Sequence, residues 1–274
     1  MRRGWFEVCA LLLAAMLAIC VKSWADPIVT SGFTTTDLPA NDDGSSASTA
    51  IGFNINFFGT SYSNLFVNNN GNLTFTNSLS TYTPFGLSGV TTPIIAPFFG
   101  DVDTRGSGSG LVNYGQGTFS GYSAFVANYP DVGYYAAGTD KLDNFQVILV
   151  DRSDTGTGNF DIYFNYGQIQ WETGSASFGT DGLGGVSAAV GYSNGLAGAS
   201  NISYQLPGSL VPGSFIDSGT QPLISSSNDG VPGQFLFQVR NGSVSPVPEP
   251  SCLVLLGAGI LGLLCMSRFR FTSR

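Results

Sequence analysis

The sequence predicts an all-β protein, an antiparallel β-sandwich-like single domain flanked by an N-terminal signal helix and a C-terminal transmembrane helix. Three observations predict this class. Short apolar or alternating segments recur along the chain between clusters of Gly, Ser, Asn and Asp. No stretch between the two ends keeps helical periodicity over three turns. Each end carries an apolar run without charge.

The first 25 residues have the pattern of a secretory signal peptide. Two arginines follow Met1, residues 8–21 are apolar, and small residues stand three and one positions before Asp26. The apolar run is shorter than the roughly 17 residues at the lower limit for a membrane span. We therefore expect cleavage between Ala25 and Asp26, and export of the chain through the inner membrane.

Residues 26–50 are rich in Ser, Thr, Asp, Asn and Ala, which predicts a polar leader before the folded domain of residues 51–240. From Ile51 to Phe57 apolar and polar residues alternate, as in a half-buried strand. The pair Asn70-Gly71 then favours a two-residue type I′ hairpin turn, which would place Phe66 opposite Phe75.

Further short strands are expected through the rest of the domain. At Phe160 the alternation places Phe160, Ile162, Phe164 and Tyr166 on one face. The remaining segments are 94–99, 111–114, 122–129, 145–150, 169–171, 186–192, 202–205 and 234–239.

Residues 241–250 read as a polar, proline-rich spacer, and residues 251–274 as a membrane tail. An apolar run at about residues 252–266 is followed by Arg268 and Arg270, which would act as a basic stop and keep this end in the cytoplasm. Pro248, Glu249 and Pro250 precede the run, and this order resembles the PEP-CTERM sorting signal of Gram-negative bacteria. The resemblance implies that a membrane protease of the exosortase type recognises the tail, and that the mature protein is released or re-anchored at the cell surface. The alternative is a permanent anchor that nothing cleaves.

Composition excludes several functions. The chain has no His, and its four cysteines lie at positions 9, 20, 252 and 265, so an exported domain would have neither a Ser-His-Asp triad nor a thiol nucleophile. Residues 26–250 carry four basic and seventeen acidic side chains, a formal charge of −13 against −8 for the whole chain. This charge repels nucleic acid and attracts cations, which excludes nucleic acid as a partner.

Three segments together resemble the nidogen-type extracellular (NIDO) domain, with the likeness covering roughly residues 53–218. They are residues 95–104 (IAPFFGDVDT), residues 165–174 (NYGQIQWETG), and residues 188–195 (AAVGYSNG) followed by residues 206–209 (LPGS). The resemblance implies cell–matrix adhesion and extracellular association, and it implies no catalytic activity. It supports the assignment of the domain, but it identifies no particular binding partner.

Asp101 and Asp103 are the candidate metal ligands. Their spacing of two puts both carboxylates on one face of an extended chain, where they repel unless a cation compensates. Calcium binds such oxygen ligands in flexible geometry. The alternative is that Asp101 stabilises the following turn, with Arg105 as the counter-charge. No cofactor is otherwise required.

Three other groups have a structural and a functional interpretation. Asp151, Asp154 and Asp161 lack the spacing of an EF-hand loop and favour a solvated turn. Glu172, beside Trp171, would need a second carboxylate to form a glycosidase site. The tyrosines at 122, 129, 134 and 135, near Asp131, either stack on sugars or lie half-buried along strands.

The leading hypothesis is a non-catalytic surface protein that acts in cell–matrix adhesion or in association with a biofilm matrix, with a matrix or exopolysaccharide component as its partner. The alternatives are a carbohydrate-binding module that retains exopolysaccharide and a carboxylate-based glycosidase that uses Glu172.

Overall fold

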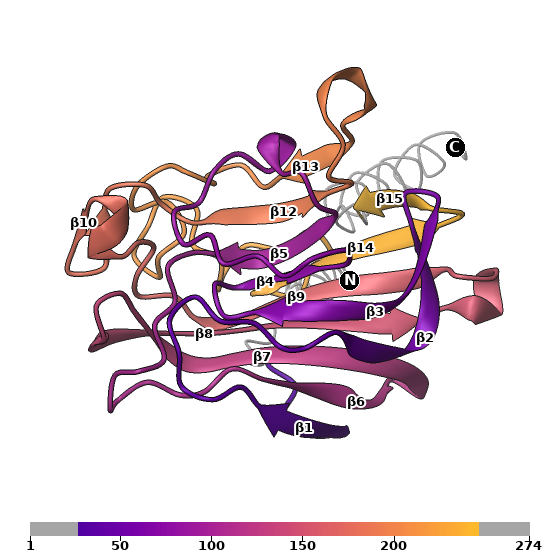
Figure 1. Ribbon diagram of the computed structural model, residues 1–274, viewed down its shortest axis with the longest axis horizontal. Helices are drawn as coiled ribbons and strands as arrows, with labels where there is room; N and C mark the ends of the chain where they lie inside the picture. Colours follow the sequence, from indigo (N-terminus) through magenta and orange to yellow (C-terminus); the bar gives the residue numbers. More distant parts are fainter. Residues whose placement is uncertain (1–26, 247–274) are drawn as a thin grey trace, which may run out of the picture. The chain divides into compact units, whose positions relative to one another are not determined.

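The computed structural model describes residues 27–246 and shows an all-β fold built from two layered sheets (Figure 1). The larger sheet has seven strands in the order β1-β6-β7-β8-β9-β14-β15, and the smaller has six in the order β13-β12-β5-β4-β3-β2. Strands β10 and β11 form a separate ribbon. Every pairing is antiparallel.

The strands are β1 (Phe33–Asp37), β2 (Thr49–Phe57), β3 (Thr60–Asn68), β4 (Asn72–Thr74), β5 (Ile94–Phe99), β6 (Asn113–Phe119), β7 (Tyr122–Tyr134), β8 (Gly138–Asp151), β9 (Phe160–Gln168), β10 (Gly179–Thr180), β11 (Leu183–Gly184), β12 (Ala189–Ser193), β13 (Ser203–Gln205), β14 (Gln234–Arg240) and β15 (Ser243–Pro246). Four short 3₁₀ turns join them: η1 (Leu87–Gly89), η2 (Ser153–Thr155), η3 (Ser175–Ser177) and η4 (Gly198–Ser200).

The core lies between the two sheets and is largely aromatic. Phe98 of β5 contacts Phe145 of β8, with ring centroids 5.3 Å apart. Tyr192 of β12 meets Phe237 of β14 edge to face at 5.4 Å. Side chains from two facing sheets that interdigitate in this way define a sandwich, so the predicted all-β, antiparallel, sandwich-like class is confirmed.

The alternating segments bury the faces that their patterns predict. In β2, Ile51, Ile55 and Phe57 are buried while the residues between them are partly or fully exposed. In β9, the side chains at 160, 162, 164 and 166 all join the main core cluster. Strand β5 coincides with the predicted segment and is buried along its whole length.

The hairpin between β3 and β4 forms, but its register differs from the prediction by one residue. Asn68 pairs with Asn72, so the loop has three residues and Phe66 lies opposite Thr74 rather than Phe75. Of the loop residues only Gly71 has positive φ, at 75°. A three-residue loop needs one left-handed position, whereas the expected type I′ turn needs two.

The segment expected to be a polar leader contributes to the fold. It contains β1, which pairs with β6 at the edge of the large sheet, and Leu38, which is buried in the core. The start of the expected spacer is also ordered, since β15 pairs with β14. The described unit therefore begins before residue 51 and continues beyond residue 240.

Residues 169–171 do not form the expected strand, because carboxylates take the place of a strand partner. The backbone N–H groups of Gln170 and Trp171 donate to one oxygen of Asp143, at 2.7 and 3.1 Å. The N–H of Ile169 donates to Asp217 at 2.8 Å. An extended segment can satisfy its donors through side chains as well as through a ladder.

The signal peptide (1–25), its cleavage pair Ala25 and Asp26, the sorting motif at residues 248–250, the expected transmembrane helix (252–266), Arg268 and Arg270 lie outside the described residues. Within residues 27–246, no helix has the length and apolar character needed to cross a membrane.

Candidate functional site

The two acids that the sequence predicts as calcium ligands lie in the loop after β5 and have different surroundings. Asp103 is paired with Arg105, whose side chain donates to both carboxylate oxygens at 2.8 and 2.6 Å. The backbone N–H of Ala137 adds a bond of 2.8 Å. The predicted counter-charge role of Arg105 is therefore fulfilled at Asp103 and not at Asp101.

Asp101 has a different environment. Its side chain is fully buried, and neither carboxylate oxygen accepts a hydrogen bond from any residue between 27 and 246. It lies instead beside Asp42 and Asp43, and one carboxylate oxygen from each of the three residues lies within 4.8 Å of the others. Asp101 therefore belongs to a cluster of three acids, together with Asp42 and Asp43.

The turn that carries Asp42 and Asp43 is held against the β5 loop by backbone and amide groups. Asn41 accepts the N–H of Gly44 at 2.7 Å, which closes a local turn. The backbone N–H of Thr104 donates to the Asn41 carbonyl at 2.9 Å, and the Thr104 hydroxyl accepts the Asn41 N–H at 2.9 Å.

The hairpin between β3 and β4 supports the same turn from a second direction. The side-chain amide of Asn69 donates to the backbone oxygen of Asp42 at 2.6 Å. That of Asn70 donates to the Asp43 carboxylate at 2.8 Å. The asparagine-rich hairpin loop therefore positions both acids.

Burial and the charges of neighbouring acids both affect the pKa values of the cluster. Burial, together with the charges of Asp42, Asp43 and Asp103, raises the pKa of Asp101 to about 7. Burial and the charges of Asp103 and Asp43 raise the pKa of Asp42 to about 6. Burial acts to raise the pKa of Asp103 too, but its hydrogen bonds from Arg105 and Ala137 lower it. The cluster around Asp101 is short of positive charge.

Sequence reasoning missed Asp42 and Asp43 because nearly sixty residues separate them from Asp101. One signal could have found them: they are the only adjacent acidic pair in the chain, and they lie in a turn-forming Asn-Asp-Asp-Gly run.

Glu172 is a structural carboxylate. It is fully buried. It accepts the backbone N–H groups of Gly213, at 2.6 Å, and of Phe215, and the hydroxyl of Ser187 at 3.2 Å. Burial raises its pKa against these donors. A carboxylate saturated by backbone donors and shielded from solvent organises the chain; it has no access to a substrate.

Asp143 is the second acid beside Trp171, and it is equally inaccessible. It has no solvent exposure, and one of its oxygens accepts the two backbone N–H groups described above. The indole N–H of Trp171 donates to the Val132 carbonyl at 3.0 Å. The two acids therefore flank a buried core residue, not a cleft.

Three of the four tyrosines considered for sugar stacking have little free ring surface. Tyr129 is buried and donates to the Asn68 carbonyl at 2.8 Å, and Tyr134 is buried with its hydroxyl on Asp140 at 2.6 Å. Tyr122 is 38% exposed, but the Arg152 guanidinium covers its ring at 4.8 Å. These three side chains therefore favour the interpretation in which the tyrosines pack along the strands.

The glycine-containing turn after β8 carries its own counter-charges. Arg152 contacts Asp154 at 3.0 Å and Asp161 at 2.9 Å, and Arg240 contacts Asp161 at 2.7 Å. Arginines thereby neutralise Asp154 and Asp161, while Asp151 accepts the backbone N–H and the hydroxyl of Ser153.

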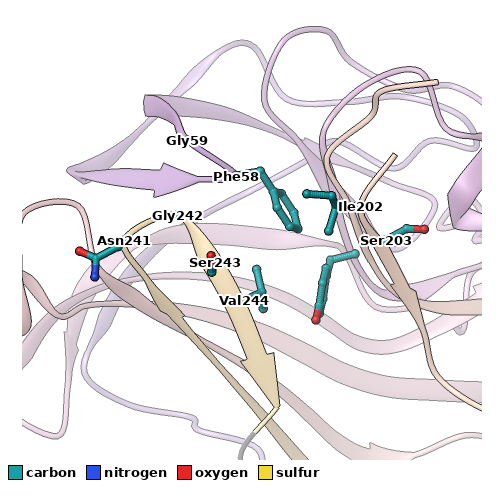
Figure 2. A pocket seen from close by; sticks show the side chains of 9 residues that line it. Phe58, Gly59, Ile202, Ser203, Asn241, Gly242, Ser243 and Val244 are labelled. Carbon is teal, nitrogen blue, oxygen red and sulfur yellow. The ribbon is translucent and has the colours of Figure 1, made fainter. Parts of the chain in front are cut away.

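An open groove with a cavity volume of about 460 Å³ lies between the β2–β3 turn, the start of β13 and the β14–β15 turn (Figure 2). Its lining combines aromatic and aliphatic side chains with glycines and short polar residues, and tyrosine is its only titratable residue. It is lined by Phe58, Gly59, Tyr192, Ile202, Ser203, Asn241, Gly242, Ser243 and Val244. Such a lining offers surface for contact and contains no carboxyl, imidazole or amine side chain for acid–base catalysis.

The three segments that carry the NIDO resemblance converge in space. Ala189 pairs with Phe99 in adjacent strands, and Phe98 meets Trp171 edge to face at 5.7 Å. The Ser209 hydroxyl accepts the N–H of Val190 at 3.0 Å. The shared residues therefore form one continuous part of the core.

Comparison with known proteins gives the same assignment. The sequence profile of a family described as NIDO-related matches residues 24–210. Alpha-tectorin from Gallus gallus is 31% identical over 237 residues, which is 77% of this chain and 10% of that protein. Alpha-tectorin from Homo sapiens is 32% identical over 239 residues with the same coverage. Nidogen from Drosophila melanogaster is 32% identical over 211 residues, 68% of this chain and 14% of that protein.

The chain thus spans about a tenth of the length of the alpha-tectorins that it matches. No solved structure matches it.

Proposed function

Because this chain belongs to the NIDO-related family, we propose that it is a non-catalytic, matrix-associated extracellular protein whose described domain acts in adhesion. Its partner is a component of an extracellular or biofilm matrix. The observation that carries the proposal, beside family membership, is the burial of Glu172, the only glutamate among the described residues.

The absence of catalytic groups supports the adhesive role. Residues 27–246 contain no His and no Cys, and the two acids beside Trp171 have no solvent exposure. A glycosidase needs two accessible carboxyl groups about 5–10 Å apart on either side of a bound sugar. Glu172 and Asp143 instead accept backbone N–H groups inside the core, where neither can reach a glycosidic bond.

The acidic surface supports an extracellular partner other than nucleic acid. Four basic residues are set against many acidic ones in the described domain, and such a surface favours cations and neutral or basic partners.

Adhesion can be tested with beads that carry the purified full-length protein. We expect retention on matrix isolated from biofilm of the producing cells, and none on beads that carry heat-denatured protein. Repeating the retention assay with matrix digested by protease, and with matrix digested by glycan hydrolases, identifies whether the partner is a protein or a glycan. Retention that only the glycan hydrolases abolish would favour the carbohydrate-binding alternative, and absence of retention on every matrix would refute the adhesive role.

Catalysis is tested in parallel with the same protein. Hydrolysis of matrix glycan by the wild type, lost in a folded Glu172→Gln variant, would overturn the assignment of Glu172 as structural.

The two ends support a finer proposal about export and anchoring. Residues 1–25 direct export, and residues 248–274 act as a sorting tail that inserts as a single helix in the inner membrane and is cut by an exosortase-type protease. The support is the order of motif, apolar run and arginines at the C-terminus. Mass spectrometry of the native protein tests this. A mature C-terminus near Pro250 would support processing, and a terminus at Arg274 would favour the permanent anchor.

A further inference from the structure

We propose that Asp42, Asp43 and Asp101 form a calcium site, which fastens the segment between β1 and β2 to the loop that follows β5. The site differs from the pair of acids that the sequence predicts, because Asp103 is already neutralised by Arg105. Metal binding here is independent of the adhesive role, and its test does not require a matrix partner.

The separation of the three carboxylates fits one calcium ion. Calcium binds oxygen ligands at about 2.3–2.6 Å, so two oxygens on the same ion lie at most about 5 Å apart. One oxygen from each of Asp42, Asp43 and Asp101 already lies within 4.8 Å of the other two. No large rearrangement is needed for a single ion to contact all three.

The state of Asp101 points independently to a ligand. A buried carboxylate is normally satisfied by hydrogen bonds or an ion pair, because leaving it unpaired is costly. Asp101 is fully buried and both its oxygens lack a hydrogen-bond partner among residues 27–246. Since one of these oxygens lies within 4.8 Å of an oxygen of Asp42 and of an oxygen of Asp43, a cation between the three acids would satisfy it.

Asp42 also has a carboxylate oxygen without a hydrogen-bond partner among the described residues. Its Oδ2 meets Arg105 at 3.0 Å, whereas its Oδ1 is buried and accepts no hydrogen bond from the described residues. Among residues 27–246, Arg105 is the only cationic side chain that forms an ion pair with these loops, and it is shared between Asp42 and Asp103. One guanidinium cannot neutralise four carboxylates, so room remains for a divalent charge.

The donor set selects a hard cation. Only oxygen atoms are present, and the described residues contain no imidazole or thiolate that would favour zinc or copper. Magnesium needs near-ideal octahedral geometry and keeps several waters, and it usually binds one or two carboxylates. Three carboxylates on two loops match the flexible coordination of calcium better. Extracellular calcium modules bind with dissociation constants on the order of 10⁻⁴–10⁻³ M.

Binding would reach a third loop, at the tip of the β7–β8 hairpin. The backbone N–H of Tyr135 donates to the Asp101 carbonyl at 3.1 Å, and the N–H of Ala137 donates to Asp103 at 2.8 Å. Gly174 packs directly on the Asp101 carboxylate, where no Cβ would fit. A cation on Asp101 would therefore order these segments together.

Thermal melting of the full-length protein tests the site, with about 10 mM calcium against chelator. For the dissociation constants above, the wild type should melt about 3–10 °C higher with calcium. Magnesium at the same concentration should give a smaller rise. Isothermal titration with calcium chloride should give one site per chain.

Four variants locate the effect. Asp101→Asn and Asp42→Asn should each lose the calcium-dependent rise. In chelator, Asp101→Asn should melt at or above the wild-type temperature, because it removes a repelling charge. Asp103→Asn should keep the calcium response, since Asp103 belongs to the Arg105 pair. Asp181→Asn is the matched control, an exposed carboxylate outside the cluster, and it should respond like the wild type.

A wild type whose melting is the same with calcium and with chelator would overturn the proposal. A calcium response that persists in both Asp101→Asn and Asp42→Asn would place the ion elsewhere and also overturn it. If Asp101→Asn fails to fold, Asp42→Asn decides by the same criterion, because Asp42 is less buried.

Discussion

Replacing Glu172 distinguishes a structural carboxylate from a catalytic one. Its two oxygens hold the backbone of residues 213–215 through the N–H groups of Gly213 and Phe215, and also accept the Ser187 hydroxyl. In Glu172→Gln one oxygen becomes an amide that cannot accept, so at least one backbone N–H faces another donor. In Glu172→Ala all three donors lose their acceptor.

The expected cost follows from the number of donors left without a partner. A hydrogen bond to a charged group contributes about 1.5–3 kcal/mol, and an unsatisfied buried donor costs about 1–3 kcal/mol. We expect Glu172→Gln to lose about 2–3 kcal/mol and Glu172→Ala about 4–6 kcal/mol of unfolding free energy. For a domain of this size each kcal/mol lowers the melting temperature by about 2–4 °C. The two variants should therefore melt about 4–12 °C and about 8–24 °C below the wild type.

Thermal and urea unfolding of the same preparations measure these losses. Asp181→Asn is the control, because it removes an exposed carboxylate and should change stability by less than about 0.5 kcal/mol. A Glu172→Gln protein that melts within about 1 °C of the wild type would refute the reasoning, since the donors would then not depend on the carboxylate.

Two further predictions concern a buried carboxyl group and a tight turn. Burial raises the pKa of Asp143 well above 3.8. Between the pKa of the unfolded chain and that of the folded chain, the carboxyl group is therefore protonated only when the protein is folded. The unfolding free energy accordingly rises as the pH falls through the folded pKa. The melting temperature of Asp143→Asn relative to the wild type should therefore be higher at about pH 8 than at about pH 5; a pH-independent difference would contradict the sign. In guanidinium unfolding, Gly71→Ala should lose at least about 2 kcal/mol more stability than Gly59→Ala. Placing an alanine in the left-handed conformation costs about 1–2 kcal/mol by itself, and both variants carry that cost. Both glycines have positive φ, but only at Gly71 would a Cβ overlap the Phe98 carbonyl, so equal losses would exclude that overlap as the cause.

The parts of the fold that the sequence predicts are those that local pattern determines. Alternation in β2 and β9 identifies the buried faces, because side chains on a strand repeat with period two. The apolar segment at Ile94 gives the bounds of β5. These features do not depend on which strand lies next to them.

The failures share a non-local cause. Residues 169–171 carry a strand-like pattern, but Asp143 and Asp217 satisfy their backbone donors. The β3–β4 register depends on a loop length that Asn70-Gly71 alone does not determine. Strand β1 is mostly exposed and polar, and it forms because β6 offers it an edge.

The candidate site was half predictable. Asp101 could be identified from its acidic loop, and Arg105 as a counter-charge from its proximity in sequence. The partners Asp42 and Asp43 reach it only through the docking of a distant turn, held by Asn69, Asn70 and Thr104. No pattern in the sequence near Asp101 predicts its contact with that turn.

The position of β15 has a mechanical consequence. It is the outermost strand of its sheet and the last described element, and it is bonded only to β14, with Pro246 opposite Phe237 and Ser243 opposite Arg240. Tension entering from the C-terminal side would open this ladder one bond at a time from Pro246, a peeling geometry that resists force weakly. We expect single-molecule pulling from that end to show a short low-force extension before the main rupture. In a tethered domain, β15 would therefore detach and lengthen the chain by a few residues before the force reached the core.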